Sequence, residues 1–292
     1  MNAELIGIAA ALGSGASWAL GSVLFRRLGD NIPPVALTFA KGVAGALLLA
    51  LAVLATGLAP LSTEAWVLLV ASGLLGIALG DTLFFAALNN LGAHTVVILF
   101  TLGQLLTVLM GVLWLGETPS ATDWSGIALI LSGVTLVLWS KISGPEGRTR
   151  LSGVAYGLLA IVAMSVSVII AKEALASAGT VQASLIRMLA GTLGIFAFGL
   201  ATGQLADGLQ ALRRPSLLGF FLVSVAVVTF GGFWLSLVAL AHLDVSIANT
   251  LTATEPLFVL PLAALFLQER ITRVVVLGAL MSCIGIVLIV AA

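Results

Sequence analysis

The sequence predicts an all-α membrane protein with ten transmembrane helices. Three observations predict it: 61% of the 292 residues are hydrophobic, only 8% are charged, and the mean hydropathy is +1.23. A soluble domain is about half apolar and about a quarter charged, so most of this exterior must contact a lipid bilayer. The apolar runs are long and continuous, without the alternation of apolar and polar residues that a β-barrel requires.

The ten spans follow from the length of these runs. A helix needs about 20 mostly apolar residues to cross roughly 30 Å of hydrocarbon. Charges, prolines and polar clusters then divide the chain into spans at residues 5–26, 34–57, 65–88, 93–115, 122–140, 151–171, 181–203, 215–241, 244–267 and 271–290. The first run has no Lys or Arg before it, so we expect a retained span and not a secretory signal.

The two halves of the chain repeat each other. The longest polar connector separates residues 1–141 from residues 151–292 and comprises residues 142–150. Residues 146 or 152 positions apart match between the halves, namely Lys41 with Arg187, Gly7 with Gly153, Gly45 with Gly191, Glu117 with Glu269, Gly126 with Gly278 and Gly133 with Gly285. Five spans per half is an odd number, so the second half must enter the membrane from the opposite side. The sequence therefore predicts two inverted five-helix repeats around a central cavity.

Basic residues in the short loops predict the orientation. Nine Lys and Arg residues lie on the side that holds the loops between spans 1–2, 5–6, 7–8 and 9–10, against Lys172 alone on the other side. Because cytoplasmic loops carry the excess of positive charge, we expect the 142–150 connector in the cytoplasm. Both termini are then expected on the non-cytoplasmic side.

Four charged side chains inside spans are candidate functional residues, because charge is costly in a bilayer. Lys41 and Asp81 lie at equal depth in spans two and three, which predicts a structural or gating ion pair; alternatively, Lys41 extends to the interface. Arg187 is the equivalent of Lys41, but Phe233 occupies the place equivalent to Asp81. Arg187 could recognise a substrate carboxylate or extend to the outer interface.

The fourth charge, Glu255, lies near the middle of span nine and directly before Pro256. Proline frees a backbone carbonyl one turn earlier and can kink a helix, which suits a cavity wall. The Glu255 carboxylate could bind an ammonium group or carry a coupling proton, or it could hydrogen-bond neighbouring helices for packing alone. Other polar or aromatic residues in mid-span complete the expected cavity: Trp18, Gln104, Trp234 and Asn249.

The sequence gives no support for catalysis, metal binding or nucleic-acid binding. Lys+Arg and Asp+Glu number 12 each, so there is no excess of basic residues to neutralise phosphates. His94 and His242 stand at span ends without a second ligand, and Cys283 is the single cysteine. Common hydrolase and metalloprotease motifs do not occur. We therefore expect no enzyme, no cofactor and no metal.

The ends of the two halves resemble the EamA family of the drug/metabolite transporter superfamily. Leu113-Trp114-Leu115-Gly116-Glu117 precedes Gly126 and Gly133, and Phe266-Leu267-Gln268-Glu269 precedes Gly278 and Gly285. Gln268 departs from the usual Leu-Gly-Glu, and Gln104 stands where the second half has Pro256. The resemblance is greatest to the bacterial YddG-like exporters of aromatic and neutral amino acids. It implies an inner-membrane protein with alternating access, a cavity enclosed mainly by spans 1, 3, 4, 6, 8 and 9, and peripheral spans 5 and 10.

The expected function is export, or facilitated movement, of amino acids, aromatic or neutral ones in particular. The expected partners are a small-molecule substrate and the bilayer, and the chain is compatible with a monomer. One alternative is proton-coupled export of cationic drugs or other small metabolites, with Glu255 as the coupled carboxylate. A membrane enzyme or lipid flippase-like component and an ion channel are rivals from other classes.

Overall fold

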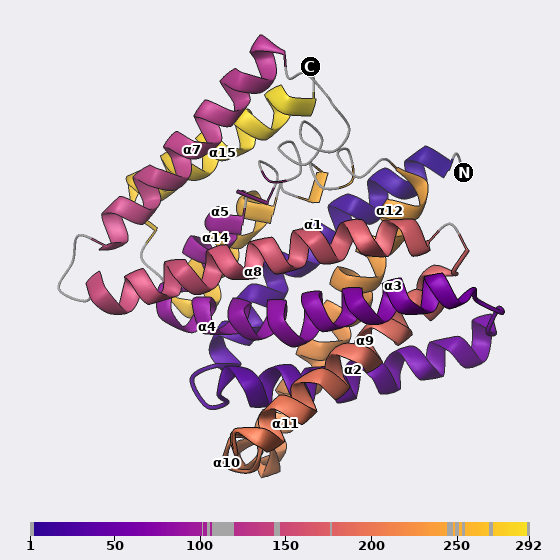
Figure 1. Cartoon of the computed structure of the whole chain (residues 1–292). Coiled ribbons are helices and arrows are strands. Elements are labelled where there is room, and N and C mark those ends of the chain that lie inside the picture. Colours follow the sequence, from indigo (N-terminus) through magenta and orange to yellow (C-terminus); the bar gives the residue numbers. More distant parts are fainter. Residues whose placement is uncertain are drawn as a thin grey trace.

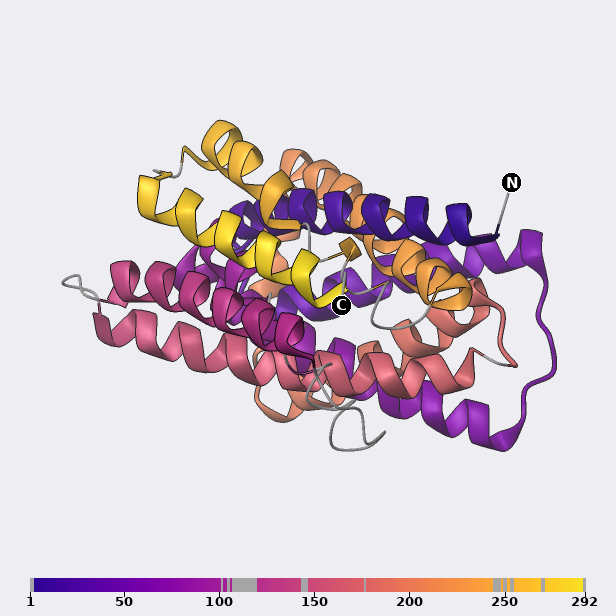
Figure 2. The same cartoon turned by 90° about the horizontal axis from the view of Figure 1, so that it is seen from above.

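The computed structural model describes residues 3–100, 102–103, 106, 120–142, 147–175, 177–243, 248, 251–252, 255–268 and 271–290. Every regular element within these ranges is a helix, which confirms the predicted all-α class. The helices form one bundle, with the N-terminus of the first helix at one end of it (Figures 1 and 2).

Six helical segments are long and apolar enough to cross a membrane: Leu5–Leu28, Pro34–Thr56, Thr63–Leu91, Leu151–Ala174, Thr180–Ala201 and Pro215–His242. They lie in α1 (Ala3–Leu28), α2 (Pro34–Thr56), α8 (Gly147–Ala174) and α9 (Thr180–Ala201), and in two composite helices. The composites are α3 (Thr63–Gly73), η1 (Leu74–Asp81) and α4 (Thr82–Leu91), and α11 (Pro215–Ala226), η3 (Val227–Trp234) and α12 (Leu235–His242). Predicted spans 1, 2, 3, 6, 7 and 8 are thus confirmed, and the chain is a multi-pass membrane protein.

The other four predicted spans correspond to helices whose described apolar stretches are shorter. These are α5 (Ala93–Phe100), α7 (Ala121–Ile142), α14 (Glu255–Leu267) and α15 (Arg273–Val290). Residues 107–119, 244–247 and 253–254 lie outside the described ranges. Spans 4, 5, 9 and 10 therefore remain predictions. A short α10 (Leu205–Leu209) and η2 (Gln210–Arg213) connect α9 to α11.

Local sequence signals explain where several helices begin and end. Pro34 and Pro215 stand in the first turns of α2 and α11, where a missing N–H costs no helical hydrogen bond. The Ser62 hydroxyl accepts the N–H of Ala65 at 3.1 Å and caps α3. Gly57 follows α2 with φ +77°, a conformation that glycine adopts without strain.

The repeat is visible in the helix contacts as well as in the sequence. The equivalent helices α1 and α8 run in opposite directions (Figures 1 and 2). Contacts between the two halves occur in equivalent pairs, in which the halves exchange roles. Gly7 packs on Leu243 as Gly153 packs on Leu91, Gly21 on Val228 as Ser167 on Gly76, and Gly45 on Thr229 as Gly191 on Ile77. The observed contacts support an inverted relation between the halves.

Helices α7 and α15 pack mainly against each other at one side of the bundle (Figure 1). Their backbones touch at the four matched glycines, where Gly133 faces Gly278 and Gly126 faces Gly285. A methyl group built on Gly133 would lie 2.6 Å from the carbonyl oxygen of Gly278. Small residues let membrane helices approach this closely, because no side chain separates the two backbones.

Both composite helices change to π-helical geometry at equivalent places, η1 in the first half and η3 in the second. A π-helical turn widens the helix and rotates the side chains that follow it, and such turns are frequent at functional sites. Asp81 ends η1, and Phe233 lies in the last turn of η3. The two π-helical segments thus carry the two residues that the repeat relates to each other.

Candidate functional site

A cavity of about 240 Å³ lies between the helices. Residues of α1, η1, α4, α5, α8, α9, η3, α12 and α14 contribute to its wall, together with Gly103, Ala248 and Thr252. Most of the lining is apolar or aromatic, and its charged members are Asp81, Arg187 and Glu255. A concave, largely apolar site with a few placed polar groups is typical of small-molecule binding.

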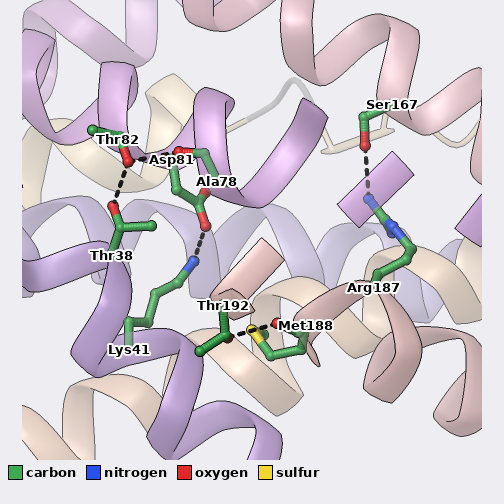
Figure 3. Close-up of polar contacts among 9 residues, drawn as sticks. All are labelled: Thr38, Lys41, Ala78, Asp81, Thr82, Ser167, Arg187, Met188 and Thr192. Carbon is green, nitrogen blue, oxygen red and sulfur yellow. Dashed lines mark hydrogen bonds and ion pairs between the residues drawn. The ribbon is translucent and has the colours of Figure 1, made fainter. Parts of the chain in front are cut away.

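Asp81 forms a buried ion pair with Lys41, whose Nζ donates to Oδ2 (Figure 3). Lys41 is 2% exposed and Asp81 4% exposed, so both charges are almost wholly removed from the outer surface. Asp81 lines the cavity, while Lys41 on α2 is not among the described lining residues. The carboxylate therefore presents itself to the cavity with its charge already matched by the protein.

The second buried cation, Arg187 on α9, has different surroundings. Its Nη2 donates to the Ser167 hydroxyl at 3.1 Å (Figure 3), and its Cζ lies 4.7 Å from the ring centroid of Phe233. The guanidinium Nε has no hydrogen-bond partner among the described residues, although Arg187 is only 5% exposed. Arg187 lines the cavity with its fork incompletely satisfied.

Ser167 is itself held by a reciprocal contact between α8 and α3. Its hydroxyl donates to the Ser72 carbonyl at 2.7 Å, and the Ser72 hydroxyl donates to the Ser167 carbonyl at 2.7 Å. Arg187 packs on the same helix through its backbone, where a methyl group on Gly73 would lie 2.9 Å from the Arg187 Cα. The position of the guanidinium is thus fixed by two neighbouring helices.

The two halves contribute equivalent positions to the cavity wall, but the side chains at these positions differ. The Trp18 indole lies against Gly232, and its equivalent Met164 lies against Gly80. Trp18 and Met164 both line the cavity. The two walls therefore have the same backbone contact but different side chains, which makes the cavity chemically asymmetric.

Glu255 is the first residue of α14 and contributes a second carboxylate to the lining. Ser22 of α1 donates to its Oε1 at 3.4 Å, a long hydrogen bond. No ion pair of Glu255 occurs in the described part of the chain, in contrast to Asp81. Its charge is therefore open to a cationic group or a proton from the cavity.

The structure places the predicted site residues in three groups. Trp18, Asp81, Arg187 and Glu255 line the cavity, and Lys41 lies behind Asp81. Trp234 is not among the described lining residues. Its indole N–H donates to Thr180 Oγ1 at 3.3 Å, and its ring meets Phe230 edge-on. Gln104 and Asn249 lie outside the described residues.

Sequence reasoning did not select several residues of the wall, among them Ser167, Met164, Phe84 and Phe100. Apolar and aromatic residues in a span usually pack against other helices, so their identity alone carried no signal. Ser167 could have been found by its place in the repeat, since its equivalent Gly21 packs against Val228 where Ser167 packs against Gly76. Within the described residues there is no cluster of His, Cys, Asp and Glu that could hold a metal ion.

Comparison with known proteins establishes the family. One solved structure, titled "Crystal structure of protein", is 18% identical, with a TM-score of 0.59 over 99% of this chain and 97% of that chain, which shows a shared fold. None of the curated proteins compared with the chain matches it. The EamA-like transporter family matches residues 5–139 and again residues 151–291. The chain, matched in both halves, therefore belongs to the EamA-like transporter family.

Proposed function

We propose that the chain exports amino acids with neutral, apolar or aromatic side chains across a bacterial-type inner membrane, by alternating access. The family supports membrane transport of a small substrate. The observation that carries the narrower proposal is the composition of the cavity, in which a carboxylate without an ion pair among the described residues shares the wall with aromatic rings. An amino acid has the matching parts, an ammonium group and an apolar side chain.

Each residue of the proposed site has a role. Glu255 binds the ammonium group, because a carboxylate in a site of low dielectric attracts a cation strongly. Trp18, Phe84 and Phe100 hold the apolar side chain through ring contacts. Gln104 and Asn249 stay predicted members of the site. The Lys41–Asp81 pair is proposed to be structural or gating and not a site for substrate.

The proposed architecture is ten spans in two inverted five-helix repeats, residues 1–141 and 151–292, with a cytoplasmic linker at 142–150. Both termini lie on the non-cytoplasmic side, and the protein acts as a monomer of the YddG-like type. The opposite directions of α1 and α8 support the inversion, and so do the equivalent contacts between the halves. Rocking of the halves about the cavity would then alternate its access.

A second candidate function is proton-coupled export of cationic drugs or other small metabolites. The long contact between Ser22 and Glu255 favours it, because a carboxylate without a cationic partner can exchange a proton with the cavity. In this case transport would depend on an imposed pH gradient, and that dependence would require Glu255.

Uptake of radiolabelled amino acids into proteoliposomes tests the proposal, with and without a pH gradient. We expect saturable uptake of leucine or phenylalanine without a gradient, reduced at least tenfold in Glu255→Gln, since a lost charged contact of about 1.5–3 kcal/mol corresponds to tenfold or more. Trp18→Ala should reduce the uptake of phenylalanine more than the uptake of alanine. Glu64→Gln, the same change at an exposed carboxylate in the first turn of α3, is the control.

Two outcomes would overturn the assignment. One is that no amino acid is taken up by protein that elutes as a folded species, and the other is that Glu255→Gln and Trp18→Ala both transport as the wild type does. Uptake that requires the gradient, and loses this requirement in Glu255→Gln, would favour the second candidate function.

A further inference from the structure

We infer that the transported molecule carries an anionic group that binds Arg187, and that Phe233 creates this specificity by occupying the place of a counter-ion. The inference rests on the proposed function for the identity of the substrate, an amino acid, whose carboxylate is the anionic group. It adds a second anchoring point, opposite in charge to Glu255, so a purely cationic substrate binds more weakly than one that also carries an anionic group.

The repeat relates the two buried cations and exposes the difference between them. Lys41 and Arg187 are 146 positions apart, and Asp81 and Phe233 are 152 positions apart, the same offsets that relate the contacting glycines. In the first half the cation meets a carboxylate, and in the second half it meets an aromatic ring. The protein thus supplies a counter-ion at one of two equivalent places.

A ring compensates a buried guanidinium only in part. Cation–π contact contributes roughly 0.5–2 kcal/mol, whereas desolvation of an ion costs several kcal/mol in a protein interior. Of the five N–H donors of Arg187, the structure satisfies one through Ser167, and Nε has no partner among the described residues. Nε is itself buried, so the remaining Nη donors are the ones that can meet an acceptor that enters the cavity.

The other charges around the cavity do not supply the counter-ion that Arg187 lacks. Asp81 interacts with Arg187 electrostatically, but its hydrogen bond goes to Lys41. The group of Lys41, Asp81 and Arg187 therefore has a net charge of +1. Glu255 contacts Ser22 of α1 and forms no described ion pair with Arg187. One monoanionic group beside Arg187 would neutralise the cluster.

The guanidinium is also held in a defined orientation for such a group. Ser167 is locked by its reciprocal bonds with Ser72, so it fixes one edge of the fork. Gly76 brings η1 close enough that a methyl group there would lie 3.6 Å from Arg187 Nη2. A planar carboxylate is the acceptor that matches a fixed guanidinium fork, since both of its oxygens can be used.

Phe233→Asp supplies the missing counter-ion and is the test variant, with Phe233→Asn as the neutral control of the same size. Leucine and leucinamide, which lacks the carboxylate, are compared as substrates in proteoliposomes. We expect leucine transport in Phe233→Asp to fall at least tenfold below that of Phe233→Asn. Leucinamide transport should differ less than twofold between the two variants. Equal leucine transport by the two variants would overturn the inference.

A binding measurement separates this inference from the proposed function. Thermal stabilisation of purified protein by isovalerate is compared with that by isovaleramide, which has the same shape without charge. Stronger stabilisation by isovalerate than by isovaleramide, present in wild type and lost in Phe233→Asp, supports the anion site even when no amino acid is transported. Absence of any difference between isovalerate and isovaleramide in the wild type would refute it.

Should Phe233→Asp not fold, Ser167→Ala tests the same site. Removal of the orienting hydroxyl is expected to weaken isovalerate binding about five- to tenfold, because the guanidinium loses its single described hydrogen bond. Isovaleramide binding should be unchanged. Loss of both ligands in equal measure would indicate a purely structural role and would contradict the inference.

Discussion

The buried pair of Lys41 and Asp81 allows a quantitative prediction by a double-mutant cycle. Asp81→Asn keeps the shape of the side chain and removes its charge, and Lys41→Met removes the cation and keeps the apolar stem. With exposures of 2% and 4%, a charge left alone has little of the hydration that would replace its partner. Each single variant should therefore lose about 3–5 kcal/mol of stability, the usual cost of breaking a buried pair.

The double variant should lose less than either single variant, because a neutral Met–Asn pair leaves no uncompensated charge. At an effective dielectric constant of about 20 and a separation of about 3 Å, the attraction between the charges is roughly 5 kcal/mol. We therefore expect a coupling free energy of at least about 3 kcal/mol. Unfolding in mixed micelles of increasing SDS fraction, followed by tryptophan fluorescence, measures all four proteins.

The exposed pair of Arg26 and Asp30 is the matched control. Its side chains are 27% and 60% exposed, and Asp30 lies four residues after Arg26, just beyond the end of α1. Asp30→Asn should cost less than about 1 kcal/mol, because water replaces the lost partner. If Lys41→Met and Asp81→Asn each cost as little as this control, or if their effects are additive in the double variant, the buried pair does not hold α2 against η1.

Three further predictions concern helix contacts. Gly73→Ala pushes against the backbone of Arg187 and should lower stability by about 1–3 kcal/mol in the same unfolding assay, while Gly219→Ala, with nothing within 4 Å, should raise it by up to about 1 kcal/mol. Gly133→Ala should separate α7 from α15 at a similar cost of about 1–3 kcal/mol, and an unchanged stability would show that the two backbones are not in contact. Lys172 donates to two carbonyls at the end of α12, so Lys172→Met should speed amide exchange there at least tenfold by mass spectrometry, and an unchanged rate would exclude this role.

The six confirmed spans could be predicted from the sequence because lipid exposure requires a long apolar run and polar residues mark its ends. The second span was expected at residues 34–57, and α2 is Pro34–Thr56. The repeat could be predicted because charges and glycines at fixed offsets are rare by chance. Lys41, Arg187 and the four glycines of α7 and α15 were sufficient for it.

The π-helical segments could not be predicted, because no local composition distinguishes η1 or η3 from an ordinary apolar helix. This affected the site directly. Trp234 was predicted as a cavity residue and Phe233 was not, yet Phe233 is the described lining residue. A π-helical stretch rotates the positions that follow it, so a uniform helical period misplaces neighbouring side chains. Partners from distant helices, such as Ser167 for Arg187, depend on tertiary packing that composition does not contain.

The glycine contact between α7 and α15 has a consequence for the origin of the molecule. Gly126 is equivalent to Gly278, and Gly133 is equivalent to Gly285. Exchanging the two halves therefore turns the contact Gly126–Gly285 into the contact Gly133–Gly278. One half alone, present in two copies of opposite orientation, would therefore form both contacts with itself, as in an isologous homodimer. Such a homodimer could not contain a carboxylate at one of the two equivalent places and a phenylalanine at the other. Joining two copies into one gene lets the surfaces that hold the halves together stay alike while the residues that face the substrate diverge.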